Sequence, residues 1–146
     1  MKLLFLDIDG VMTSDALNLE KGSDGKIYPF SSSCVAALNE ILRSNKVKII
    51  LTSSWRTVFD IEKQCQVFKE NGVVQFPSGE TADLGFENRG DEIKAYLQNR
   101  NVDSFIILDD MEINGFGEHF LKIDPSFGLT AKHAHEANRI LAKHNR

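Results

Sequence analysis

Residues 2–10 read KLLFLDIDG, a short apolar run that two alternate aspartates and a glycine close. Lys2–Leu6 has no helical spacing of apolar residues and predicts a strand that is buried on both faces. Two later runs have the same character: VKIIL at 47–51 and SFIIL at 104–108. Each of the three ends in polar residues, which is typical of parallel strands whose carboxyl ends meet a ligand.

Helical periodicity separates these strands. Apolar residues that recur every three or four positions predict four helices, and the last one begins after Thr130 as its N-cap. The residues expected to face the core are Val35, Leu38, Ile41 and Leu42; Val58, Ile61, Cys65 and Phe68; Ile93, Tyr96 and Leu97; and Ala134, Ala137, Ile140 and Leu141. We also expect strands at Val73–Phe76 and Phe120–Ile123, with a loop at Pro77–Asn88. The alternation predicts an α/β fold, a three-layer sandwich around a central, mostly parallel sheet.

Size and composition favour an ordinary globular protein. The 146 residues suit one domain over 1–146, and the net charge of −4 does not by itself indicate a surface that binds nucleic acid. Cys34 and Cys65 are expected to be buried, reduced thiols. The apolar run at the N-terminus is too short for a signal peptide, and no run reaches the length of a membrane span. We therefore expect a cytoplasmic protein with no membrane partner.

Polar residues gather where the three central strands end. The carboxyl ends of parallel strands lie at one edge of a sheet, so that four carboxylates and two hydroxyls should meet there. These residues are Asp7 and Asp9, Thr52 and Ser53, and Asp109 and Asp110. Crowded carboxylates stay ionised when a divalent cation lies between them, and a set of oxygen ligands favours Mg²⁺. Because Mg²⁺ usually shares its shell with phosphate, the edge predicts a phosphorylated substrate, and a carboxylate there is able to attack phosphorus.

Four stretches, in chain order, resemble the motifs of the haloacid dehalogenase (HAD) superfamily of phosphohydrolases. They are LFLDIDGVMTSD at 4–15, KIILTSSWR at 48–56, NRGDEIKAYL at 88–97 and FIILDDMEIN at 105–114. The TSSWR and LDD forms, with GLT at 128–130, are most similar to the HAD phosphatase domains of RNA-repair proteins. The resemblance implies a Rossmann-like fold and Mg²⁺-dependent hydrolysis of phosphomonoesters through an aspartyl-phosphate.

The first two motifs imply the catalytic carboxylates and a phosphate site. By resemblance, Asp7 is the nucleophile and a metal ligand. Asp9 is the general acid/base and lends its backbone carbonyl to the metal. Thr52 binds a phosphate oxygen, and the backbone of Ser53 helps it.

The last two motifs imply a cation and the rest of the metal site. Arg89 stands at the expected helix start, and Lys94, one turn deeper, is the alternate. Asp110 matches the acidic metal ligand of the fourth motif, with Asp109 supporting or replacing it. The family often has another aspartate four positions later, where this chain has Asn114. Because of this difference, the residues that support the metal ligands stay undetermined.

Several residues near these motifs have two possible roles. Trp55 is expected in the core, although a nucleobase could stack on it if it faces the site. Arg56 either binds substrate or pairs with an acid in a loop. Tyr28 and Phe30 form either a wall of the substrate site or a local packing cluster.

The spacing of the motifs bears on the substrate. In the family, large caps are inserted after the first motif or before the third. Here Thr13–Ser33 has room only for a small flap, and Pro77–Asn88 only for a loop. The implied open site suits bulky substrates, such as nucleic-acid ends or phosphoproteins. The alternative is a catalytically weak module that binds phosphate or a partner on the same fold.

Overall fold

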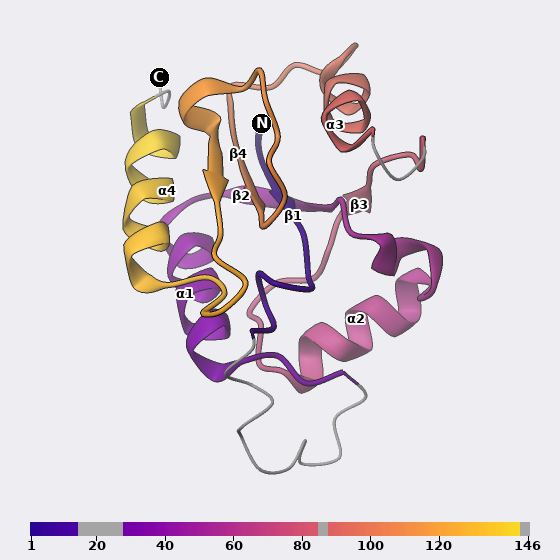
Figure 1. Ribbon diagram of the computed structural model, residues 1–146, viewed down its shortest axis with the longest axis vertical. Coiled ribbons are helices and arrows are strands. Elements are labelled where there is room, and N and C mark those ends of the chain that lie inside the picture. Colours follow the sequence, from indigo (N-terminus) through magenta and orange to yellow (C-terminus); the bar gives the residue numbers. More distant parts are fainter. Residues whose placement is uncertain (15–27, 85–87, 144–146) are drawn as a thin grey trace.

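A five-stranded parallel sheet forms the centre of the computed structural model, which describes residues 1–14, 28–84 and 88–143 (Figure 1). The strand order is β3-β2-β1-β4-β5, and every neighbouring pair is parallel. The strands are β1 (Lys2–Leu6), β2 (Val47–Leu51), β3 (Gly79–Glu80), β4 (Ser104–Asp109) and β5 (Phe120–Lys122). The three predicted central strands thus lie side by side, with β1 in the middle.

In the described residues, four α-helices and two short 3₁₀ turns accompany the strands. They are α1 (Ser32–Ser44), η2 (Ser54–Thr57), α2 (Ile61–Glu70), α3 (Arg89–Leu97), η3 (Gly117–His119) and α4 (Ala131–Lys143). Within the described ranges, no helix has the length and apolar character needed to cross a membrane. Thr130 Oγ1 accepts a hydrogen bond from the His133 amide at 3.4 Å, which supports its predicted role as a cap.

Alternate residues of β1 face opposite sides of the sheet and enter separate cores. Leu4 and Leu6 pack in a core with apolar residues of α1, α2 and α4, whereas Leu3 and Phe5 pack with α3 and the segment that follows β4. Figure 1 shows α1 and α4 together on one side of the sheet and α3 on the other. The fold is therefore the predicted α/β, Rossmann-like sandwich of three layers.

The predicted start of the second helix was wrong. Val58 and Ile61 are 74% and 54% exposed, and the buried residues of α2 are Gln64, Val67 and Phe68. The cause is a local break in the chain: Asp60 accepts a hydrogen bond from the Lys63 amide at 2.9 Å and so starts α2 after the separate turn η2. The helical stripe therefore begins later than the apolar pattern indicated. Cys65 is only half-buried, in contrast to the expected burial, whereas Cys34 is buried.

The predicted strand at Val73–Phe76 is also wrong. The Val74 amide donates to the side chain of Asn39 at 2.9 Å, and Val74 and Phe76 are about half exposed. The edge strand is β3, which lies inside the predicted loop and pairs Gly79 with Ile50. A buried asparagine on α1 thus takes the backbone bond that a strand would have used.

An aromatic cluster fills the space beside η2. It consists of Tyr28, Phe30, Trp55, Phe59 and Phe68, whose ring centroids lie 4.9–6.4 Å from their neighbours. Trp55 is buried, as expected, and Tyr28 and Phe30 form the packing cluster that was one of their two possible roles. Most of the predicted flap, residues 15–27, lies outside the described residues.

Asn71 fixes the chain that leads into this cluster. Its Oδ1 accepts a hydrogen bond from the Phe30 amide at 2.8 Å, and its Nδ2 donates to the Tyr28 carbonyl at 2.8 Å. It also donates to the Val67 carbonyl at the end of α2. One buried side chain therefore joins the end of α2 to residues 28–30.

We predict that Asn71→Ala lowers the free energy of unfolding by about 1–3 kcal/mol, because it leaves the buried Phe30 amide without an acceptor. Urea denaturation followed by circular dichroism measures this loss. Asn101→Ala, at an exposed asparagine, serves as the control and should change the free energy by less than about 0.5 kcal/mol. Equal losses in the two variants would contradict the role assigned to Asn71.

Candidate active site

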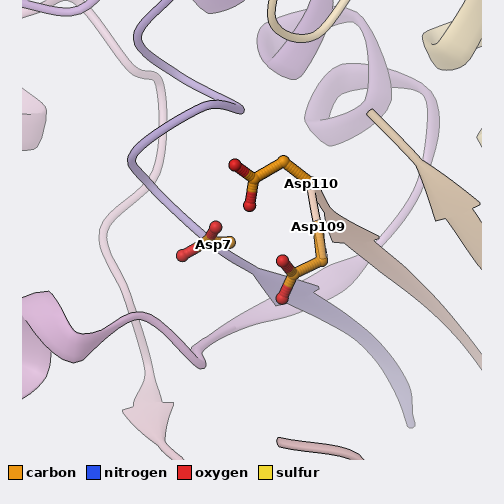
Figure 2. A group of neighbouring side chains, drawn as sticks. All are labelled: Asp7, Asp109 and Asp110. Carbon is orange, nitrogen blue, oxygen red and sulfur yellow. The ribbon is translucent and has the colours of Figure 1, made fainter. Parts of the chain in front are cut away.

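Three carboxylates meet where β1 and β4 end. The strands pair in parallel with Leu6 opposite Leu108, so that Asp7, Asp109 and Asp110 follow at the same edge of the sheet. One oxygen from each carboxylate lies within 4.8 Å of the others (Figure 2). Asp7 and Asp109 are buried, and Asp110 is half-buried. The structure thus brings together three of the four predicted carboxylates.

Gly10 allows Asp110 to approach the turn that follows β1. Its φ is +85°, and a Cβ atom built there would lie 2.3 Å from Asp110 Oδ2. Any other residue would combine a strained backbone with a collision against this carboxylate. The glycine of the first motif is therefore required by the geometry of the site.

Arg89 supplies the positive charge at the three carboxylates. It is the first residue of α3, and its Nη1 lies 2.7 Å from Asp109 Oδ2 and 3.3 Å from Asp7 Oδ1. Lys94, the alternate cation, is exposed, and its Nζ lies over the Phe116 ring at 5.9 Å from the centroid. Of the two predicted cations, Arg89 is the one that contacts the carboxylates.

One arginine does not balance this much negative charge. Burial, followed by repulsion from Asp109, raises the pKa of Asp7 to about 8, and the opposing attraction of Arg89 is smaller. Burial also raises the pKa of Asp109 despite its ion pair with Arg89. In the absence of a further cation, the site therefore favours protonated carboxyl groups.

Thr52 brings a hydroxyl to the neighbouring strand end. Its amide donates to the Leu6 carbonyl at 3.0 Å, which places it beside the start of the Asp7 turn. Thr52 is fully buried, and its Oγ1 has no hydrogen-bond partner among the described residues. A buried hydroxyl without a partner is costly, so this atom is suited to a polar ligand. Ser53 is also buried, but its Oγ accepts from the Trp55 amide at 3.1 Å and begins η2.

Arg56 makes the ion pair that was one of its two expected roles. Its Nη1 donates to the carbonyls of Thr52 and Ser53 at 2.5 and 2.7 Å, and its Nη2 lies 2.9 Å from Glu92 Oε2. The nearer acid, Glu92, belongs to α3, and the Arg56 and Glu92 side chains are both at least 95% buried. Asp83, in the predicted loop, also pairs with Arg56, with its Oδ1 3.9 Å from Nη2. Glu92 also accepts from the Leu84 amide at 2.7 Å. Both terminal nitrogens of Arg56 are therefore engaged within the protein, whereas its Nε has no partner among the described residues.

Asp9 lies apart from the other carboxylates. It is exposed, does not belong to the group of three, and accepts a hydrogen bond from Tyr28 Oη. Burial, and then the bond to Asp9, raises the pKa of Tyr28, so that its hydroxyl keeps its proton. Sequence reasoning missed this contact, because nothing in the spacing of residues 9 and 28 indicates that they meet.

Comparison with known proteins places the chain in a family. A family model, described as the HAD domain in Swiss Army Knife RNA repair proteins, matches residues 3–134. The chain belongs to this HAD family. No curated protein and no solved structure shows significant similarity to it.

The matched region of this HAD domain includes all four predicted motifs and every residue of the site. The finding confirms the resemblance to the RNA-repair branch of the superfamily. The roles assigned to individual residues remain predictions.

We predict that this HAD domain binds Mg²⁺ and that Gly10→Ala weakens the affinity by roughly 10- to 100-fold, the usual effect of disturbing groups that orient a ligand. Titration calorimetry measures the affinity. Gly72→Ala is a matched control, because Gly72 has a similar φ of +78° but nothing lies within 4 Å of its Cβ position. Both variants should lose roughly 1–2 kcal/mol of stability through backbone strain, but only Gly10→Ala should lose affinity.

We further predict that, in EDTA, the free energy of unfolding falls as the pH rises from about 4 to about 8. The folded protein holds a proton on Asp7 up to a pKa of about 8, whereas the unfolded chain releases it near pH 4. The charges that face this group are Asp109, Asp110 and Arg89. Asp7→Asn should flatten the dependence and stabilise the metal-free protein at pH 8.

Urea denaturation at several pH values measures this effect. Glu62→Gln, at an exposed carboxylate on α2, should keep the slope of the unsubstituted protein. A slope that persists unchanged in Asp7→Asn would show that another group holds the proton.

Proposed function

We propose that this HAD domain is a Mg²⁺-dependent phosphomonoester hydrolase that forms an aspartyl-phosphate on Asp7. The observation that carries the proposal is the group of three carboxylates, two of which contact Arg89. The buried Thr52 hydroxyl, which has no partner among the described residues, adds a phosphate-binding group at the next strand end.

The group of carboxylates suits Mg²⁺. Asp7, Asp109 and Asp110 offer only oxygen atoms, one from each within 4.8 Å of the others. Burial, and then the charge of Asp109, raises the pKa of Asp7, and a bound cation would oppose both effects. Asp7 and Asp110 are the proposed side-chain ligands, and the Asp9 carbonyl is a further candidate. Asp109 is the less available carboxylate, because Arg89 and the Met111 amide occupy its oxygens. When bound, Mg²⁺ would neutralise the carboxylates and the phosphoryl oxygens.

The chemistry proceeds in two displacements. A carboxylate oxygen of Asp7 forms a bond to phosphorus while the bond to the leaving oxygen breaks, and that oxygen takes a proton from the Asp9 carboxyl group. Asp9, now ionised, then takes a proton from a water molecule whose oxygen attacks phosphorus. The bond between phosphorus and Asp7 breaks, which releases inorganic phosphate and restores both carboxyl groups.

The remaining residues hold the phosphoryl group. Thr52 Oγ1 donates to one non-reacting oxygen, and the Ser53 backbone assists it. Arg89 offsets the negative charge that the phosphoryl oxygens carry in the transition state. Its fixed position between Asp7 and Asp109 requires no movement when charge develops.

Phosphorylated nucleic-acid ends are the proposed substrate class. The support is the family description, which concerns RNA repair proteins. The described residues carry no large cap over the site, and this leaves room for a bulky substrate. The alternative, a phosphate-binding module with little activity, is retained as an outcome of the test below.

We predict release of inorganic phosphate from p-nitrophenyl phosphate and from 3′- or 5′-phosphorylated oligonucleotides. EDTA should stop the release and Mg²⁺ should restore it. Asp7→Asn should abolish turnover, and Asp9→Asn should slow it by roughly two to four orders of magnitude. Asp103→Asn, at an exposed carboxylate in the turn before β4, is the matched control and should keep full activity.

The substrate panel should also contain phosphopeptides and sugar phosphates. Turnover by Asp7→Asn at the normal rate would exclude the aspartyl-phosphate. Binding of phosphate without turnover of any substrate would favour the module.

A further inference from the structure

Tyr28 makes a direct contact with a proposed catalytic group. Its Oη donates a hydrogen bond to Asp9 Oδ1, and Asp9 is the first-motif carboxylate that is exposed and lies outside the group of three. An exposed aspartate side chain is free to rotate unless a partner fixes it. Among the described residues, this hydrogen bond orients the Asp9 carboxyl group.

The core, in turn, fixes Tyr28. Its ring makes edge contacts with Trp55, Phe59 and Phe30, at centroid distances of 5.7, 6.1 and 6.4 Å. Its carbonyl accepts the Asn71 Nδ2 hydrogen bond at 2.8 Å. The hydroxyl thus points from a packed ring toward Asp9, and the packing of the ring sets its position.

We propose that Tyr28 is a positioning residue that orients Asp9 for proton transfer to the leaving group. Because Oδ1 accepts the bond from Tyr28, the transferable proton of the Asp9 carboxyl group resides on Oδ2. In the first displacement this proton moves from Oδ2 to the leaving oxygen as its bond to phosphorus breaks. In the second, Oδ2 takes a proton from water, and Tyr28 keeps its own proton throughout. This inference rests on the proposed function.

Tyr28→Phe tests the proposal, because it removes only the hydroxyl and keeps the packed ring. The assay compares an alkyl phosphate, whose leaving oxygen needs a proton, with p-nitrophenyl phosphate, whose leaving group departs without one. We expect kcat/KM to fall by roughly 10- to 100-fold for the alkyl phosphate and to change little for p-nitrophenyl phosphate. A residue that served only to stabilise the fold would lower both rates together.

Tyr96→Phe is the matched control. The Tyr96 ring also makes an edge contact, to Phe5 at 5.8 Å, but it lies in the core on the other face of the sheet. This variant should leave both rates unchanged. Thermal unfolding and near-ultraviolet circular dichroism verify that each variant is folded.

A double-mutant cycle links the two residues. In an Asp9→Asn background, Tyr28→Phe should have no further effect on the alkyl phosphate. Equal losses for the two substrates, or the full loss in the Asp9→Asn background, would overturn the positioning role while leaving the proposed function intact. Absence of turnover by the unsubstituted protein would overturn both.

Discussion

The parallel pairing of β1 with β4 imposes the central constraint on this HAD domain. It sets Leu6 opposite Leu108, and the chain then has to place Asp7 beside Asp109 and Asp110. Buried like charges repel one another strongly, and Arg89 offsets only part of the repulsion. The same hydrogen bonds that stabilise the sheet therefore create a site that is short of positive charge. Such a site attracts a cation. When no cation is bound, the repulsion between the carboxylates lowers the stability of the folded protein.

Contacts between the neighbouring elements hold the groups around the carboxylates in place. Arg56 is bonded to the carbonyls of Thr52 and Ser53 and to Glu92, which lies one turn of α3 beyond Arg89. The backbone of Thr52 and the helix that begins with Arg89 are thus joined through the buried ion pair of Arg56 and Glu92. Breaking such a pair usually costs about 3–5 kcal/mol, because it leaves a buried charge alone. In the other core, packing within the aromatic cluster holds Tyr28 next to Asp9. The site is therefore held by both cores of the sandwich.

Sequence reasoning succeeded where the local pattern and the final environment agree. The central strands are mostly apolar, so the positions of β1, β2 and β4 followed from the sequence, and α1 and α4 followed from their apolar stripes. It failed where polar side chains override the pattern. Asp60 starts α2 later than the stripe of Val58 and Ile61 indicated, and Asn39 binds the Val74 amide. Both effects depend on single hydrogen bonds, which the spacing of apolar residues does not indicate.

The sequence by itself determined the α/β class, the sheet edge where the polar residues gather and the residue types available there. These follow from hydrophobic periodicity and from the order of residues after each strand, which are local properties. Only the tertiary structure decided which of these residues meet: Arg89 rather than Lys94 at the carboxylates, Arg56 paired with Glu92, and Tyr28 bonded to Asp9. The physical reason is that each contact joins segments far apart in the chain, so that its geometry exists only once the sheet and both cores have formed.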